Sequence, residues 1–155
     1  MTGTVVAIFT TPEGGDPMEA REEVAAVAGS GLVGDRYATA AGTFSGNPGG
    51  GREVTLIARE GIDAANAEGV TIDASETRRN LVTEGIDLGE LIGRTFAVGE
   101  AILRGVRDCP PCKYLEEKTR PGVRVGLERR GGLRADIVRD GVIHVGDKIT
   151  EVDAV

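Results

Sequence analysis

The stretch TFAVGEAILRGVR, residues 95–107, holds two short apolar runs, 95–98 and 101–107, on either side of Gly99-Glu100. Short runs of Val, Ile, Leu and Thr bounded by glycine are typical of β-strands joined by tight turns. The same pattern recurs along the chain, in which 24 of 155 residues are glycine. Six further strands are predicted, at residues 5–10, 24–28, 53–57, 79–83, 133–138 and 148–152.

Helical patterns are fewer and shorter than the strands. Residues 58–67 place apolar side chains at helical spacing and end before a glycine. Single turns are expected at 75–78, 88–92 and 123–129, and a short helix at 112–118. Because strands and short helices do not alternate regularly, the sequence favours a mostly β, barrel-like α+β fold. We expect one domain over residues 1–155, with its core at about 5–152.

Cys109-Pro110-Pro111-Cys112 follows the second of the two opening runs directly and holds both cysteines of the chain. The turn precedes the short helix, and unpaired backbone N–H groups at a helix N-terminus stabilise a thiolate. Arg107 and Lys113 add positive charge. The pair is therefore a candidate soft ligand or sulfur carrier.

The two cysteines are compatible with three other roles. Two cysteines in 155 residues is not the density of a disulfide-held secreted scaffold. A structural zinc site needs four ligands, and the chain adds only one histidine, His144, in a strand-like segment. A thiol-disulfide redox pair usually follows an early strand, whereas this motif comes late. The redox pair remains the competing interpretation, and His144 is left out of the site.

Charge is unevenly distributed along the chain. The net charge is −7, yet residues 104–139 carry ten Lys or Arg against five Asp or Glu, an excess of +5, so the remainder carries −12. Such a molecule is not suited to broad nucleic-acid binding, but its basic region suits a compact anion such as a phosphate. No apolar run approaches the length of a membrane span, and we expect a cytoplasmic protein without membrane or nucleic-acid partners.

Residues 39–51, TAAGTFSGNPGGG, are rich in glycine and poor in core-forming side chains. They are expected to form a long mobile loop. Arg36 and Arg52 stand at its two ends. Since long loops in compact domains are often functional, we favour a lid or ligand-wrapping role over a plain connector.

Seven short motifs in order resemble the MOSC domain, which forms the C-terminal part of molybdenum cofactor sulfurases and occurs as small stand-alone bacterial proteins. The motifs span nearly the whole chain, and together they are more specific than any one of them. They are Gly34-Asp35-Arg36, Val54-Thr55-Leu56-Ile57, Thr77-Arg78-Arg79-Asn80-Leu81-Val82, Gly93-Arg94-Thr95-Phe96-Ala97-Val98-Gly99, Cys109-Pro110-Pro111-Cys112, Gly131-Gly132-Leu133-Arg134-Ala135 and Gly146-Asp147.

The resemblance implies a barrel-like fold that binds the molybdenum cofactor (molybdopterin), with a cysteine that ligates molybdenum or handles sulfur. At the level of the family alone, the resemblance also implies pyridoxal phosphate binding. The family's key cysteine follows a proline and precedes a short helix, which matches Cys112 before Lys113-Tyr114-Leu115. Local physics leaves Cys109 open, because Pro110 and Pro111 suit a first helical turn and would bring Cys109 near the cap. We favour Cys112 as the metal ligand.

A phosphate tail requires guanidinium groups, and four arginines lie in the matching motifs: Arg36, Arg78, Arg79 and Arg134. Asn80 is expected either to bind a pterin amide edge or to close a turn. The residues do not decide between a sulfur-transfer or carrier protein and a small molybdoenzyme that reduces N-hydroxylated compounds. Since the chain has too few cysteines for an all-cysteine iron-sulfur cluster, an enzyme would take electrons from a separate protein, and a carrier would meet a separate sulfurase.

Overall fold

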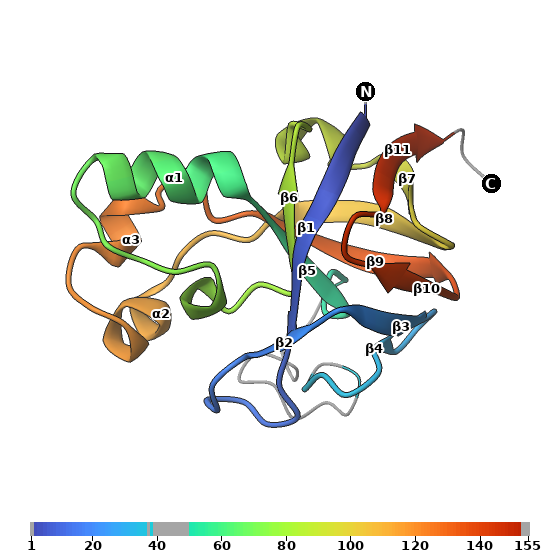
Figure 1. Cartoon of the computed structure of the whole chain (residues 1–155), viewed down its shortest axis with the longest axis horizontal. Helices are drawn as coiled ribbons and strands as arrows, with labels where there is room; N and C mark the ends of the chain where they lie inside the picture. The colour runs from blue at the N-terminus through green and yellow to red at the C-terminus, as the bar shows by residue number, and fades with distance from the viewer. Residues whose placement is uncertain (1, 37, 39–49, 153–155) are drawn as a thin grey trace.

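The computed structural model describes residues 2–36, 38 and 50–152, and Figure 1 shows strands gathered beside a group of short helices. The strands are β1 (Thr2–Thr10), β2 (Glu19–Arg21), β3 (Glu23–Val27), β4 (Gly31–Leu32), β5 (Val54–Ala58), β6 (Leu81–Glu84), β7 (Thr95–Val98), β8 (Ala101–Asp108), β9 (Leu133–Arg139), β10 (Gly141–His144) and β11 (Lys148–Val152). The helices are α1 (Arg59–Ala67), α2 (Lys113–Lys118) and α3 (Val123–Gly126), with 3₁₀ turns η1 (Ser75–Thr77) and η2 (Leu88–Leu91).

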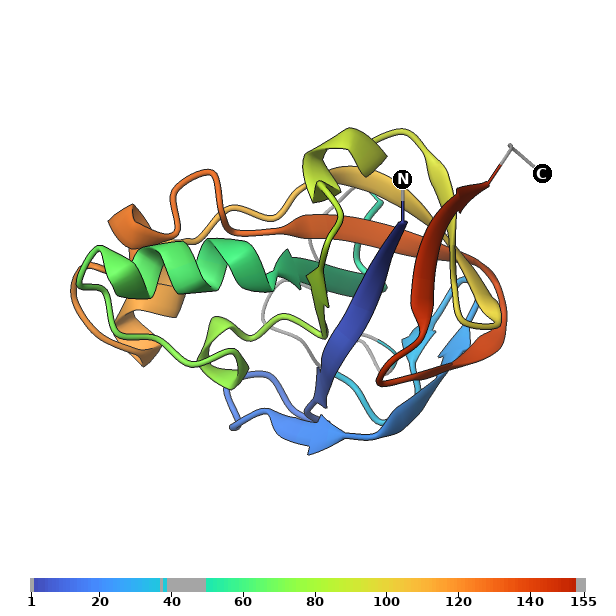
Figure 2. The same ribbon diagram turned by 45° about the horizontal axis from the view of Figure 1, so that its top comes forward.

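Seven strands close into a barrel in the order β1, β6, β5, β9, β8, β7, β11 and back to β1. The closing pair is antiparallel and joins Thr2 to Thr150; Figure 2 shows β1 beside β11. Only β5 and β6 run parallel among these pairs, with α1 and η1 in their connection. Strand β2 extends the sheet from β1, and β10, β3 and β4 form a second small sheet. The predicted mostly β, barrel-like fold is confirmed.

Alternate side chains of the strands fill the barrel. Along β9, Leu133, Ala135 and Ile137 are buried, and Phe96 and Val98 of β7 meet them in the same apolar cluster. This alternation is the two-residue period of a strand with one face in the core. The barrel interior is therefore a packed core and leaves binding functions to its outer face.

A second apolar cluster lies between the outer wall of the barrel and the helices. An irregularity in β1 between Val5 and Ala7 changes which side chains face inward. Val5 belongs to the barrel core, whereas Val6 and Ala7 both pack against the second cluster. The helices thus cover one side of the barrel, where the thiol turn (residues 109–112) connects β8 to α2 (Figure 1).

Several sequence-based limits need correction. Strand β6 begins at Leu81 rather than 79, because Arg78 adopts a left-handed conformation (φ 60) that ends η1 and turns the chain before the strand. The helix predicted at 58–67 begins at Arg59, since Ala58 still pairs with Thr83. Of the expected mobile loop at residues 39–51, residues 39–49 lie outside the described part. Within the described ranges, no helix is both long and apolar enough to cross a bilayer.

Candidate functional site

The thiol turn is held by the barrel at one end and opens α2 at the other. The Cys109 N–H donates to the carbonyl of Gly132 (2.8 Å), which continues the β8–β9 pairing beyond Asp108. Cys112 is the N-cap of α2, with extended backbone (φ −125, ψ 170). The alternative in which Pro110 and Pro111 form the first helical turn, with Cys109 near the cap, is wrong, because the helix begins only at Lys113 and its N-cap is Cys112.

The two thiols occupy different surroundings. Both are free, but Cys109 is 1% exposed, whereas Cys112 is half-buried and packs against the second apolar cluster. Cys109 borders a hollow of about 440 Å³ whose other walls include Glu128, Arg129 and Gly131. The turn therefore offers one sheltered and one more accessible sulfur.

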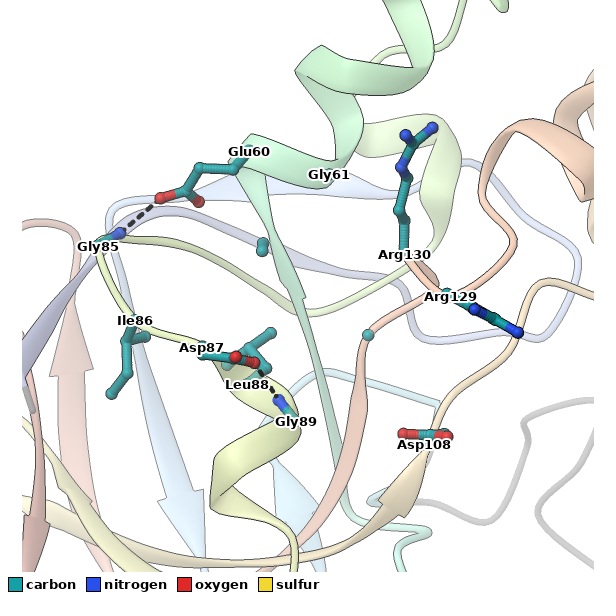
Figure 3. A pocket seen from close by; sticks show the side chains of 12 residues that line it. Glu60, Gly61, Gly85, Ile86, Asp87, Leu88, Gly89, Asp108, Arg129 and Arg130 are labelled. Atoms are coloured by element: carbon teal, nitrogen blue, oxygen red, sulfur yellow. Dashed lines mark hydrogen bonds between the residues drawn. The ribbon is translucent and has the colours of Figure 1, made fainter.

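A larger hollow of about 500 Å³ adjoins the one at Cys109, since Asp108, Arg129 and Gly132 line both. Figure 3 shows Arg129 and Asp108 on one side of this hollow and Glu60 on the other. The Glu60 carboxylate already accepts a bond from the Gly85 N–H (2.7 Å). The charged residues that line both hollows are Asp108 and Arg129, and no sequence motif marks either of them.

Arg79 lies beneath the thiol turn and is 8% exposed. Its Nε donates to the Gly131 carbonyl (2.7 Å) and its Nη2 to the carbonyls of Cys109 (2.9 Å) and Pro110 (3.3 Å). Its Nη1 donates to the Thr77 carbonyl (3.2 Å). One guanidinium thus ties η1, the thiol turn and the loop before β9 together.

Arg36 makes a similar clamp on the other side of η1. It is 4% exposed, and its Nη1 pairs with the fully buried carboxylate of Asp35 (3.0 Å). Its Nη2 donates to the Arg78 carbonyl (3.1 Å). Asp35 also accepts from the Thr11 N–H (3.1 Å), so this ion pair anchors the start of the segment 11–18.

Arg78 projects toward that same segment from its left-handed backbone position. Its Nη1 donates to the Asp16 carbonyl (2.6 Å), and the Lys118 ammonium donates to the Gly15 carbonyl (3.3 Å). Both cations line a hollow of about 240 Å³ together with Ser75 and Glu76. We call Arg36, Arg78, Arg79 and the segments whose carbonyls they bind the arginine junction.

Arg134 differs from these three arginines. It lies on β9 opposite Thr55 of β5 and Arg107 of β8, facing away from the barrel core that Leu133 and Ala135 fill. Its Nη1 is buried and has no hydrogen-bond partner among the described residues. An unpaired buried N–H group is rare and costly, so this donor calls for an acceptor that the described residues do not supply.

Asn80 fastens three strands beside Arg134. Its side-chain carbonyl accepts from the N–H (3.0 Å) and the hydroxyl (3.2 Å) of Thr55, and its Nδ2 donates to the Phe9 carbonyl (3.1 Å). The residue is fully buried. Asn80 was expected either to bind a pterin amide edge or to close a turn, and these contacts describe the structural role.

Two carboxyl groups, one beside the arginine junction and one at the far end of β9, have shifted pKa values. The hydrogen bonds from Arg120 (Nη2 at 2.6 Å) chiefly lower the pKa of Glu76, on the wall of the 240 Å³ hollow. Burial raises the pKa of Glu53, with a further increase from neighbouring Asp136, although the Ile137 and Gly29 N–H groups oppose it. Glu53 therefore retains a proton more readily than an exposed glutamate.

His144 lies on β10, half-exposed beside Glu23 and Asp147, as a strand residue outside the site. No group of three or more His, Cys, Asp or Glu residues within the described ranges is arranged to hold a metal ion. A metal at the thiol turn would therefore need most of its ligands from elsewhere.

Comparison with known proteins assigns the family. A family model described as MOSC domain matches residues 35–150. The chain belongs to the MOSC domain family. This family is associated with molybdenum cofactor binding, and the MOSC match includes the thiol turn and all four arginines.

Solved structures confirm the MOSC-type fold. YuaD from Bacillus subtilis is 18% identical with a TM-score of 0.78, covering 96% of this chain and 94% of that one. YiiM from Geobacillus stearothermophilus is 16% identical with a TM-score of 0.74, covering 97% and 75%. YiiM from Escherichia coli is 17% identical with a TM-score of 0.69, covering 98% and 71%. No curated protein matches the sequence.

Proposed function

We propose that the protein binds the molybdenum cofactor beside the thiol turn and uses a cysteine, Cys112, as the metal or sulfur ligand. Arg134, Arg78 and Lys118 supply positive charge for the phosphate of the cofactor. When bound, the cofactor supplies a metal centre for electron or sulfur transfer. The chain's own residues bind and orient it.

The buried Nη1 of Arg134, which has no hydrogen-bond partner in the described ranges, is the observation that carries this proposal. Leaving such a donor unsatisfied costs about 1–3 kcal/mol, and a phosphate or pterin oxygen would remove that cost. Arg78 and Lys118 border a separate hollow of about 240 Å³, where Arg78 donates to the Asp16 carbonyl and Lys118 to the Gly15 carbonyl. Their charges suit an anionic group, because charge-assisted bonds to phosphate exceed bonds to a neutral carbonyl.

The donor set at the turn also fits a molybdenum-bearing pterin. Molybdenum and transferable sulfur both favour a soft sulfur ligand. A cofactor that brings its own dithiolene needs few protein ligands, which agrees with the lack of a multi-residue metal cluster among the described residues. Cys112 is the more accessible of the two sulfurs and is therefore the preferred ligand.

Two roles share this site: cofactor sulfur transfer or carriage, with a partner sulfurase, and reduction of N-hydroxylated compounds, with a partner electron donor. Both need the same sulfur and the same anion-binding charges. An activity screen on N-hydroxylated compounds with an added reductant separates them once cofactor binding is established.

The test is molybdenum and released-pterin analysis of protein produced in cells that make the cofactor. The wild type should carry both, and Cys112→Ser and Arg134→Met should each lose most of them. Arg139→Met, at the exposed end of the same strand, is the matched control and should keep them. Arg134→Met should leave the stability of the cofactor-free protein unchanged or raise it by about 1 kcal/mol, since it removes an unsatisfied buried donor.

Wild-type protein without molybdenum or pterin would contradict the proposal. The alternative is a thiol-disulfide function, which the pairing of a sheltered Cys109 with a more accessible Cys112 favours. It requires both cysteines, so Cys109→Ser would abolish that function, whereas cofactor binding through Cys112 would survive the same substitution.

A further inference from the structure

We infer that Arg79 is a positioning residue: it holds the backbone between the two thiols in shape and places a fixed positive charge under the turn. The role of Arg79 in cofactor binding rests on the proposed function, whereas its role in positioning the thiol turn rests on hydrogen bonds of its own.

The contacts of Arg79 leave little of its guanidinium for a ligand. An arginine side chain has five N–H donors, and Arg79 directs four of them at the carbonyls of Thr77, Cys109, Pro110 and Gly131. Two of these carbonyls belong to the thiol turn itself. Arg79 therefore acts on a bound cofactor through the turn and not by direct contact.

The charge of Arg79 has no partner of opposite sign in the part of the chain that the structure describes. No ion pair joins it to a carboxylate within the described ranges, whereas the equally buried Arg36 pairs with Asp35 at 3.0 Å. A buried charge without a counter-charge is costly, and carbonyl dipoles offset only part of that cost. A positive charge maintained here favours negative charge at the turn, such as that of a metal-bound sulfur or an anionic ligand.

The loop before β9 packs closely against the thiol turn and leaves the turn little freedom to move. A side chain at Gly131 would place its Cβ about 2.3 Å from the Cys109 carbonyl oxygen, so the loop before β9 packs directly on the turn. Arg79 donates to both of these segments. It thereby fixes the spacing that keeps Cys109 sheltered.

The experiment measures alkylation rates of each cysteine by mass spectrometry in cofactor-free protein, so that it does not depend on cofactor binding. In Arg79→Ala, Cys109 should react about tenfold faster or more, the change expected when one or two net hydrogen bonds are lost. About 20 mM guanidinium, far below the molar denaturing range, should refill the site and restore slow labelling. Arg104→Ala, an exposed arginine on β8, should label like the wild type.

Arg79→Lys keeps the inference testable if the alanine variant does not fold. It retains the charge but lacks the planar set of donors, so Cys109 should label faster than in the wild type, and less so than in Arg79→Ala. Wild-type labelling in folded Arg79→Ala or Arg79→Lys would overturn the inference, as would fast labelling of Arg79→Ala that guanidinium does not slow.

The two proposals fail separately. A protein that lacks molybdenum and pterin but shows guanidinium-reversible exposure of Cys109 would keep the positioning role and lose the cofactor. A cofactor-loaded protein whose Cys109 labelling ignores Arg79 would keep the cofactor and lose the positioning role.

Discussion

The barrel and the arginine junction are held together by different forces. In the barrel, fully buried side chains such as Phe96 and Leu103 pack within a closed set of strands. In the junction, guanidinium groups bind backbone carbonyls of segments that have little regular structure. Apolar packing is spread over many contacts, whereas each arginine ties several segments at once. The difference teaches that single substitutions should damage stability in the first region and geometry in the second.

The largest expected effect tests the barrel. Phe96→Ala removes a fully buried aromatic side chain and should lower the free energy of unfolding by about 3–5 kcal/mol, measured by urea denaturation. The loss should appear equally in every spectroscopic probe, because the core is shared by all the barrel strands. A loss below about 1 kcal/mol would break the comparison, since it would mean that core packing is not dominant.

An intermediate effect tests the junction. Gly131→Ala would bring its Cβ about 2.3 Å from the Cys109 oxygen, so the thiol turn must shift. We expect a loss of about 1–3 kcal/mol in stability together with faster alkylation of Cys109.

Gly89→Ala is the control for that substitution, because the new Cβ would meet only the Asp87 carboxylate, at 3.3 Å. It should change neither quantity measurably. Unchanged Cys109 labelling in Gly131→Ala would show that the turn does not depend on the loop before β9.

The smallest effect concerns pH and η1. The pKa of Glu76 is lowered chiefly by its hydrogen bonds from Arg120, so the carboxylate stabilises the folded state above its unfolded pKa, near 4.5. That stabilisation is lost as the pH falls through the lowered value. Glu76→Gln should therefore lower the Tm by roughly 1–3 °C at neutral pH, and the gap should close in acid.

Glu117→Gln provides the comparison for this experiment, because its pair with Lys113 is exposed and long (3.9 Å). Its Tm should match the wild type throughout. A gap for Glu76→Gln that stays constant with pH would exclude the ion pair as its cause.

Much of the fold could be predicted from sequence because strand alternation and glycine turns are local signals. The limits of β7 and β11 are those predicted, and β7 alternates between half-buried and buried side chains. Strands β2 and β4 were missed, since three exposed residues and two residues carry no period. The parallel pairing of β5 and β6 depends on a distant crossover, which no local pattern records.

Less of the candidate site could be predicted from the sequence. Residue types identified the thiol turn and the four arginines, but not which carbonyls lie within reach of each guanidinium. Arg36 and Arg79 bind backbone within the fold, and Arg134 alone of the four has a buried donor with no partner in the described chain. Asp108 and Arg129 carried no motif, although Gly131-Gly132 marked the nearby close approach. The binding roles of the thiol turn and of the four arginines remain predictions.

The antiparallel contact between residues 2–4 and 148–150 has a kinetic consequence. Joining segments so distant in sequence carries a large loop-closure entropy, and such non-local pairings slow folding. During synthesis the first strand must wait for the last one to leave the ribosome. We therefore expect β1 to remain an exposed edge until late, the stage at which a nascent chain is most open to chaperones.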